Sequence, residues 1–397
     1  MTSTTANTNS PADGGARESA PREVFAGIVC YMLAPFGMGL LPLLGGAAVD
    51  RFAISGTEVG LLGTSDLAGI AVSCVLSVFW VGKVSLRKAA WASIAVLLVG
   101  NMLSMVADSF TTLCAARFIT ELGSGGMFSM ALVTLGNSSH PERFLSLGIA
   151  ATLASSVLVY LFLPEFISSI GINVLFSAHL VVIVFAMVWV HWLPVMPVSK
   201  AVQASGTQAN YLPLVFCFLA LFCLTIIQGG VWTYLERIGN AAGLTPDYIG
   251  NALAMTQVTA LAGSLATSAL GTRFGRLLPL TLGMVSLVIS FYLFRLNGGL
   301  AYMTAACITQ FCYVFCLPYL MSLCVENDPS GRFYVLTNVF KLVGMAVGPA
   351  IIALFLRGEN YFVVSVVGSV FAGLCLVFSA LVLTSMRSDQ RLERMPA

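Results

Sequence analysis

Long apolar segments alternate with short polar ones along the chain, from about residue 24 to residue 385. A helix needs about 20 mainly apolar residues to span the ~30 Å hydrocarbon core of a bilayer. Twelve segments approach this length, at residues 24–48, 59–80, 89–107, 111–135, 145–163, 172–194, 211–234, 248–270, 278–296, 299–322, 334–355 and 362–385. The pattern therefore predicts an all-α membrane protein with twelve transmembrane helices.

The composition supports this prediction. Of 397 residues, 58% are hydrophobic and 9% are charged, whereas a soluble domain carries about 25% charged residues. The net charge of +2 and the lack of a basic run argue against nucleic acid as a partner, so the lipid bilayer is the expected surrounding. All ten cysteines fall in apolar segments without a Cys-x-x-Cys pair, which argues against a disulfide framework, a metal site or another cofactor.

Polar segments divide the chain into parts. Residues 1–22 are rich in Thr, Ser, Ala, Asn, Gly and Pro, which predicts a disordered tail and does not resemble a cleavable signal peptide. Residues 195–210 are polar and lie between the sixth and seventh apolar segments, as a linker would. The expected organisation is a six-helix bundle at 23–194, a second bundle at 211–386 and a tail at 387–397.

The two halves match each other at a fixed offset. Gly82 and Arg87 correspond to Gly271 and Arg276, both at an offset of 189 residues. Arg143-Phe144 corresponds to Arg332-Phe333 at the same offset. Parallel repeats of six helices are typical of one large architecture of membrane transporters.

Lys and Arg in the predicted loops indicate the orientation. If the N-terminus is cytoplasmic, thirteen of these residues flank the cytoplasmic side, and only Arg51, Arg237, Arg295 and Arg357 flank the opposite one. Cytoplasmic loops carry an excess of positive charge. We therefore expect both termini to be cytoplasmic and the protein to be a multi-pass protein of the cell (inner) membrane.

Three short motifs resemble those of the major facilitator superfamily. The loop Gly271-Thr-Arg-Phe-Gly-Arg276 is similar to the Gly-x-x-x-Asp-Arg-x-Gly-Arg loop of that family, shortened and without the Asp. The loop from Gly82 to Lys88 is a more degraded copy. The segment Arg117-Phe-Ile-Thr-Glu-Leu-Gly-Ser-Gly-Gly126 resembles the family signature Arg-x-x-x-x-x-Gly-x-x-Gly. The resemblance covers about residues 23 to 386 and implies a transporter whose first, fourth, seventh and tenth helices line a central cavity.

Departures from the family pattern bear on the direction of transport. The predicted fifth helix lacks the Gly-x-x-x-Gly-Pro pattern that many exporters of the family carry there. A Gly344-x-x-x-Gly348-Pro349 pattern occurs instead in the eleventh helix. This favours uptake, although the first helix also lacks the Asp-Gly-x-Asp pattern of aromatic-acid symporters.

Four ionisable residues other than histidine lie deep in the predicted helices: Asp66, Arg117, Glu121 and Lys341. Charges at such depth are costly and are usually functional. Arg117 and Glu121 are four residues apart and therefore share a helix face. We expect Arg117 to bind a substrate carboxylate and Glu121 to take up a proton; the alternative is a structural ion pair.

Asp66 and Lys341 are expected near the middle of the membrane, on helices that pack across the seam between the bundles in the resembling fold. They would form an ion pair that opens and closes as a gate, with Asp66 also a candidate for proton coupling. Alternatively, each finds a partner in its own bundle.

Further candidates for substrate binding are Gln228, Trp232, Gln310 and Tyr313. Their alternatives are interhelical hydrogen bonds and, for Trp232, an interfacial anchor. His179 is expected to be a hydrogen-bonded structural residue, with a proton relay as the alternative.

The expected function is secondary active transport of a small organic solute. The sequence has no Gly-x-x-x-x-Gly-Lys-Ser/Thr loop for ATP, and a buried carboxyl suits protons as the coupling ion. Proton-coupled uptake of an organic anion is the first interpretation, and proton-coupled efflux of amphiphilic or drug-like compounds is the alternative. Three scattered histidines and no Gly-x-Ser-x-Gly argue against an enzyme, and short tails argue against a sensor with its own signalling domain.

Overall fold

The computed structural model describes residues 20–81, 83–195, 211–296, 298–328 and 334–393, and all regular structure within them is helical apart from one isolated bridge between Arg273 and Gly275. The helices are α1 (Pro21–Leu33), α2 (Phe36–Phe52), α3 (Gly56–Trp80), α4 (Leu86–Val106), α5 (Phe110–Gly136), α6 (Pro141–Ile170), α7 (Asn173–Val190), α8 (Tyr211–Ala241), α9 (Pro246–Leu270), α10 (Leu277–Leu293), α11 (Gly299–Asn327), α12 (Tyr334–Phe355) and α13 (Phe362–Glu393). Gly82, Arg332-Phe333, most of the predicted linker and most of the predicted N-terminal tail lie outside the described residues.

Each predicted segment corresponds to one helix, except the first, which is broken. α1 and α2 together cover residues 21–52 and meet at Ala34-Pro35. Pro35 has no backbone N–H and its ring opposes the carbonyl of the preceding turn, so the helix is interrupted there. Eleven helices are long and apolar enough to span a membrane, whereas α10 has 17 residues and is shorter. The count of twelve spans therefore stays a prediction.

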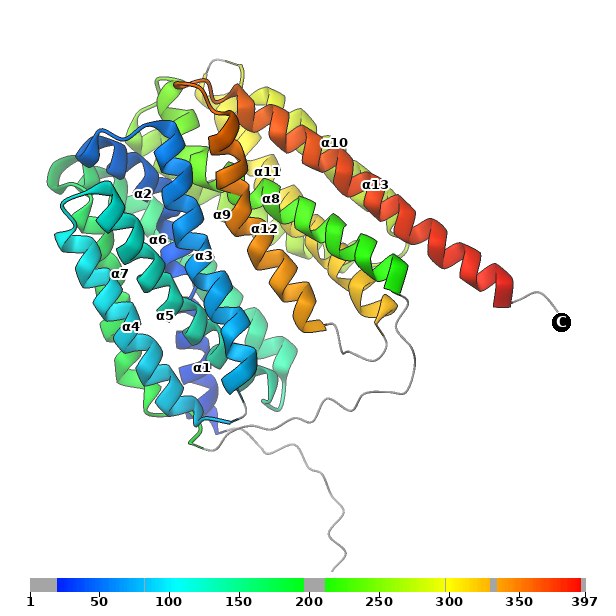
Figure 1. Ribbon diagram of the computed structural model, residues 1–397, viewed down its shortest axis with the longest axis horizontal. Coiled ribbons are helices and arrows are strands. Elements are labelled where there is room, and N and C mark those ends of the chain that lie inside the picture. The colour runs from blue at the N-terminus through cyan, green and yellow to red at the C-terminus, as the bar shows by residue number, and fades with distance from the viewer. Residues whose placement is uncertain (1–19, 82, 196–210, 297, 329–333, 394–397) are drawn as a thin grey trace, which may run out of the picture.

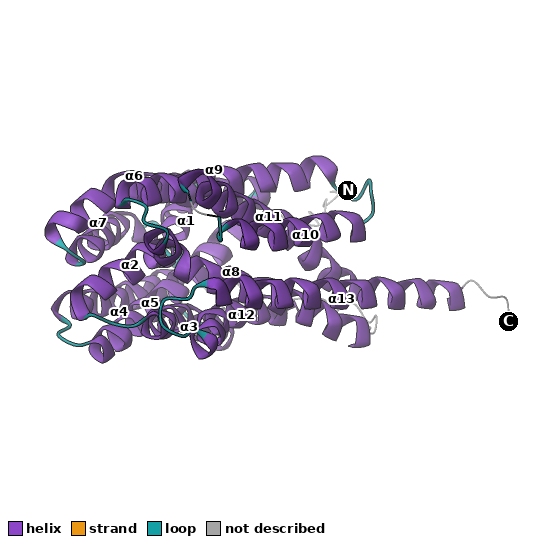
Figure 2. Cartoon of the chain, turned by 90° about the horizontal axis from the view of Figure 1, so that it is seen from above, coloured by secondary structure: helices purple, strands orange, loops and turns teal. Residues whose placement is uncertain are grey.

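The helices form two groups that follow the halves of the chain. The first half, α1 to α7, is coloured blue to green in Figure 1 and lies beside α8 to α13, coloured green to red. Figure 2 shows the same helices from above, with α4 and α7 at one end of the molecule and α13 extending at the other. The main contacts between the halves join α3 to α12, α6 to α9 and α2 to α8.

Contacts between loops identify two sides of the molecule. On the distal side, Arg51 at the end of α2 donates hydrogen bonds to Asn173 Oδ1 at 2.9 Å and to the Ala107 carbonyl at 2.8 Å. This brings together the loops that follow α2, α4 and α6. On the opposite side, which we call the terminal side, the Arg87 Nε donates to the Leu193 carbonyl at 3.0 Å. The spans of the first half therefore run in alternating directions, with α1 and α2 counted as one span.

Side-chain capping boxes occur at the starts of two helices, α3 and α5. Ser55 and Glu58 form a capping box at the start of α3, and Ser109 with Thr112 forms one at α5. These side chains bind backbone N–H groups that have no partner within the helix. The caps fix where α3 and α5 begin, and these are the two helices that carry the buried charges described below.

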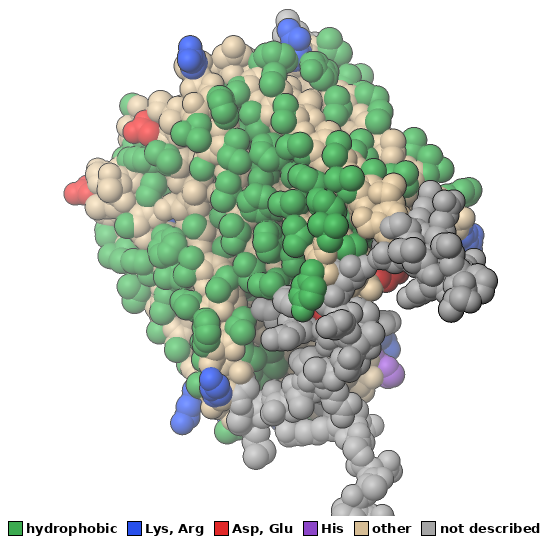
Figure 3. Space-filling model, turned by 45° about the vertical axis from the view of Figure 1, so that its right-hand side comes forward, with side chains coloured by type: hydrophobic (Ala, Val, Ile, Leu, Met, Phe, Trp, Pro, Cys, Tyr) green, Lys and Arg blue, Asp and Glu red, His purple; other side chains and the backbone are tan. Residues whose placement is uncertain are grey.

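The outer surface is suited to lipid. Large apolar side chains such as Val99, Leu158, Val181 and Leu354 are 54%, 58%, 68% and 80% exposed. Figure 3 shows one face on which hydrophobic side chains form a broad continuous area, with Lys, Arg and acidic groups towards its edges. Such an area is far too large for a soluble monomer, and it supports insertion in a bilayer.

Candidate functional site

A cavity of about 230 Å³ lies between the two halves and is the candidate substrate site. Both halves line it, through α2, α3, α5 and α6 on one side and α8, α9, α11 and α12 on the other. Its walls are mainly apolar, with a few polar groups, as in most small-molecule sites. The polar and aromatic lining residues include Phe128, Thr152, Ser156, Tyr160, Gln228, Trp232, Gln257, Gln310, Tyr313 and Lys341.

Four of the five substrate-binding candidates from the sequence line this cavity. The Gln228 Nε2 on α8 donates to Gln310 Oε1 on α11 at 3.0 Å. The Trp232 indole N–H donates to the Met38 carbonyl on α2 at 3.1 Å and therefore joins the two halves. Tyr313 lines the cavity one turn from Gln310. The structure thus brings all four residues together. Gln228 and Gln310, for each of which an interhelical hydrogen bond was the alternative, bond to each other.

Lys341 is the charged residue of this cavity. It lies on α12, is partly buried, and lines the cavity wall beside Leu342 and Met345. Among the ion pairs of the described residues, none contains Lys341. No Asp or Glu is among the described lining residues, so these residues give the cavity one positive charge when Lys341 is protonated.

A second polar site lies within the first half, at the contact of α3 and α5. The Arg117 Nε donates to Asp66 Oδ1 at 2.7 Å, and its Nη2 donates to Glu121 Oε1 at 2.6 Å. The three side chains are at most 1% exposed. Gly37 on α2 faces the same group, because a Cβ there would lie 3.1 Å from Arg117 Nη2. We call these residues the Asp66–Arg117–Glu121 triad.

The triad contains two acidic groups and only one basic group. Two carboxylates share one guanidinium, which leaves one negative charge if all three groups are ionised. The second oxygens, Asp66 Oδ2 and Glu121 Oε2, are buried without a hydrogen-bond partner among the described residues. An unpartnered buried anion is costly, so the site is suited to bind one proton.

The prediction that Arg117 binds the substrate is not supported by this geometry. Both ends of its guanidinium are engaged by carboxylates, and Arg117 is absent from the cavity lining. The i,i+4 pairing with Glu121 is present as predicted. A substrate carboxylate would have to displace an internal one. The cation among the described lining residues of the cavity is Lys341.

The predicted contact of Asp66 with Lys341 is absent in this structure. Asp66 faces Arg117 inside its own bundle, as the alternative described, whereas Lys341 faces the cavity. The reason is that α3 turns its Asp66 face towards α5 rather than towards α12. A gate formed by Asp66 and Lys341 in another access state stays a prediction.

Two buried polar residues differ from the sequence expectation. Glu236 on α8 is only 13% exposed, although residues beyond 234 were expected to leave the membrane. His179 on α7 is fully buried, and neither ring nitrogen has a hydrogen-bond partner among the described residues. Its ring lies 5.4 Å from that of Phe36, so it packs as an aromatic side chain. The hydrogen bond expected for His179 therefore has no partner among the described residues, and the expectation stays a prediction.

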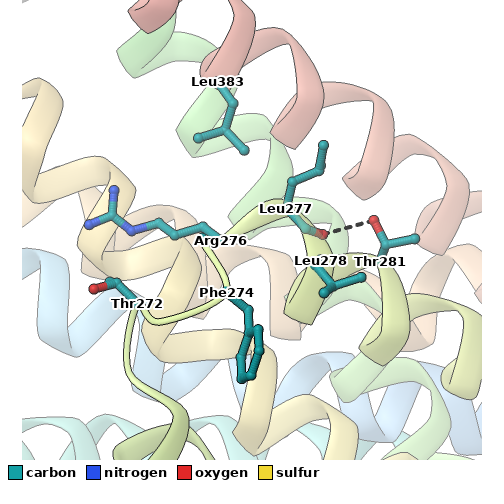
Figure 4. Close-up of a pocket in the computed structure, with 8 residues that line it drawn as sticks. Thr272, Phe274, Arg276, Leu277, Leu278, Thr281 and Leu383 are labelled. Atoms are coloured by element: carbon teal, nitrogen blue, oxygen red, sulfur yellow. Dashed lines mark hydrogen bonds between the residues drawn. The ribbon is translucent and has the colours of Figure 1, made fainter.

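A larger hollow of about 660 Å³ on the terminal side is a less suitable substrate site. Figure 4 shows its lining from the start of α10 and from α13, with Phe274, Leu277, Leu278 and Leu383 around it. Its charged residue, Arg276, forms a hydrogen-bonded ion pair with Glu326. The hydrogen bond from Arg276 to Glu326 raises the pKa of the Arg276 guanidinium. The hollow lies within the second half, so movement between the halves does not open or close it.

The family of the chain follows from comparison with known proteins. The family model described as Major Facilitator Superfamily matches residues 27–349. The chain belongs to the Major Facilitator Superfamily. It is therefore a multi-pass membrane transporter and not an enzyme. No curated protein sequence matches the chain.

Solved structures of transporters share the fold at low identity. The POT family transporter PepTSo is 13% identical, with a TM-score of 0.72, and the match covers 94% of this chain and 99% of PepTSo. The nucleoside transporter NupG is 12% identical, with a TM-score of 0.69 and coverage of 92% and 99%. A bacterial homolog of the human lysosomal transporter Spinster, solved inward-facing and occupied, is 12% identical, with a TM-score of 0.68 and coverage of 94% and 98%.

Proposed function

We propose that this transporter carries a small organic anion through the cavity between its two halves, driven by protons and in the direction of uptake. Alternating access moves the cavity from one membrane side to the other. In this proposal the membrane is the cell (inner) membrane, and both termini are cytoplasmic. The distal side then faces outwards, and the structure, in which the halves pack together on that side, represents a state closed to the outside.

The single observation that carries the choice of an anion is Lys341. It is the charged residue of a cavity whose lining, within the described part of the chain, contains no carboxylate. An ammonium in partly apolar surroundings attracts a substrate carboxylate or phosphate, and a charge-assisted hydrogen bond fixes its place. Gln228, Gln257 and Gln310 offer amide donors and acceptors for the rest of the solute, and Trp232 and Tyr313 offer apolar contact area.

The triad supports protons as the coupling ion. It lies close to the cavity along two helices, since Ile70 lines the cavity one turn from Asp66 and Phe128 two turns from Glu121. A proton on Glu121 or Asp66 removes the surplus negative charge and loosens one of the two bonds to Arg117. We infer that this changes the packing of α3 and α5 and thereby the balance between access states.

The alternative is proton-coupled efflux of amphiphilic or drug-like compounds. The apolar part of the lining, with Met38, Ile70, Leu153, Leu342 and Met345, favours it. An amphiphilic anion would satisfy both the lining and Lys341. The direction of transport therefore has to be tested separately from the charge of the substrate.

The test is uptake into sealed vesicles that contain the purified protein in known orientation. A panel of small labelled carboxylates is offered, each beside its uncharged amide, with and without an imposed pH gradient. The proposal expects that at least one carboxylate, and not its amide, accumulates when the compartment on the distal side is acidic. Accumulation of uncharged or cationic amphiphiles alone, moving against the proton flow, would support the alternative.

A further inference from the structure

The two halves meet closely on the distal side, along a contact that we call the distal seam. It joins the distal parts of α2 and α3 to those of α8 and α12. Glycines allow the close approach: a Cβ on Gly60 of α3 would lie 2.8 Å from both the Pro349 carbonyl oxygen and the Ala353 Cβ of α12. The Tyr234 hydroxyl crosses the seam and donates to the Gly56 carbonyl at 2.9 Å.

Glu236 of α8 places a carboxyl group in this seam. A Cβ on Gly46 of α2 would lie 2.7 Å from Glu236 Oε1, so the carboxyl contacts the α2 backbone of the opposite half. Glu236 Oε2 is buried without a hydrogen-bond partner among the described residues. The helical N–H groups of α2 are engaged within their own helix and cannot solvate a carboxylate.

The nearest cation compensates this carboxyl only weakly. Arg237 Nη1 lies 3.9 Å from Glu236 Oε2, beyond hydrogen-bond distance. The same guanidinium lies 3.9 Å from Glu359 Oε1, before α13, and also interacts with Tyr361. Arg237 is therefore shared between two acidic residues.

The other neighbours either add negative charge or carry none. Asp50 of α2 lines the same cavity of about 80 Å³ as Glu236. Tyr302 of α11 interacts electrostatically with Glu236, but its hydroxyl donates to the Leu235 carbonyl at 2.9 Å. The remaining walls come from uncharged residues of α2, α6, α8 and α9, which are Leu43, Gly46, Ala47, Pro164, Ile167, Ser168, Asn240, Pro246 and Ile249. A neutral carboxylic acid fits this surrounding, whereas a carboxylate would face Asp50 and keep its Oε2 buried without a hydrogen-bond partner among the described residues.

We propose that Glu236 is a proton-binding site that holds the distal seam closed. The carboxyl carries a proton while the seam is closed, and releases it to water on the distal side when the halves separate. On closing, the carboxylate takes a proton from that side again. The site lies in the opposite half from the Asp66–Arg117–Glu121 triad, so it acts on access and leaves the coupling proton to the triad.

The expected pH dependence follows from linkage. The closed seam binds one proton more than the open seam, so acid on the distal side favours closure and alkaline conditions favour opening. For one proton, the ratio of open to closed seam changes by up to about tenfold per pH unit. The inference does not depend on the substrate, and it stands even if the transported solute proves to be neutral.

Hydrogen–deuterium exchange of the full-length protein in nanodiscs tests this site. Exchange is followed in the seam segments 41–52 and 232–241, corrected for the intrinsic pH dependence of amide exchange, with α4 as an internal reference outside the seam. Wild-type protection of the seam segments should fall with rising pH, by up to about tenfold per unit. Glu236→Gln, permanently neutral, should keep the seam protected at all pH values.

Two variants and one ion replacement complete the design. Glu236→Asp retains an ionisable group and should retain the slope, which separates protonation from a folding defect. Glu165→Gln removes an exposed carboxylate on α6 and should behave as the wild type. A wild-type slope in Glu236→Gln would overturn the proposal. So would a flat wild-type profile with choline in place of sodium, a condition in which no sodium can replace the proton at the carboxylate.

Discussion

Replacement of Lys341 by Gln tests the charge of the substrate site. The side chain loses its ammonium but stays polar and of similar size, and no ion pair of the described residues is broken. A hydrogen bond to a charged group contributes about 1.5–3 kcal/mol. At 1.4 kcal/mol per factor of ten, the Kd of an anionic substrate should rise about 10- to 140-fold.

The assay compares each carboxylate ligand with its uncharged amide. A bound ligand stabilises the folded protein by RT ln(1 + [L]/Kd), so the shift in Tm at a fixed ligand concentration reports Kd. Lys341→Gln should lose most of the shift caused by the carboxylate and keep that caused by the amide, whereas Lys341→Arg should retain both in part. If Lys341→Gln reduced the Tm shift equally for the acid and the amide, Lys341 would not recognise the charge of the substrate and would instead contribute packing. Unchanged binding of the acid would remove Lys341 from the site.

Three further predictions concern the buried groups and the seam. Glu121→Gln should abolish accumulation driven by a pH gradient while leaving substrate exchange, as measured by counterflow in vesicles; full accumulation would exclude Glu121 from coupling. Arg117→Ala should destabilise the protein by about 3–5 kcal/mol, because two buried carboxylates lose their partner, and a denaturation midpoint near wild type would contradict this. Gly60→Leu should prevent closure of the distal seam against Ala353, which would appear as faster hydrogen exchange in segment 41–52, and unchanged protection would refute the described packing.

The sequence predicts the fold well because the bilayer imposes it. Length, apolarity and the repeat at an offset of 189 residues were sufficient to expect two bundles of six helices. The family and the helical structure confirm a multi-pass helical membrane protein, and the count of twelve spans stays a prediction. The break between α1 and α2 was not predicted, although Pro35 supplied the signal. A proline inside an apolar segment is common in membranes, so its effect depends on neighbouring helices.

The site was predicted in composition but not in arrangement. Gln228, Trp232, Gln310 and Tyr313 do line the cavity, on the helices that the family resemblance implied would line it. The third member of the triad, Asp66, could not be assigned to Arg117 from sequence. Helix spacing gives neighbours within a helix, whereas the rotation of α3 against α5 depends on glycine contacts such as Gly69 against the Phe118 carbonyl, at 2.5 Å from a Cβ.

Glu236 was missed for a different reason. The polar residues that follow Trp232 resemble the end of a transmembrane segment, so residue 234 was expected to be the last one in the membrane. α8 continues to Ala241, and the other half of the protein covers the extra turns. Where one half of the protein buries the end of a helix from the other half, polar residues can stay at the contact. The sequence there therefore lacks the apolar pattern that would predict burial.

The most direct measurement follows protons and substrate in one experiment. Wild-type protein is placed in sealed vesicles with a pH-sensitive dye inside, and a carboxylate that binds is added outside without a pre-formed gradient. Coupled uptake predicts acidification of the lumen on addition of the carboxylate, no such signal with its amide, and loss of the signal in Glu121→Gln. Carboxylate entry without any proton movement, or proton movement of equal size in Glu121→Gln, would contradict proton-coupled anion uptake through this site.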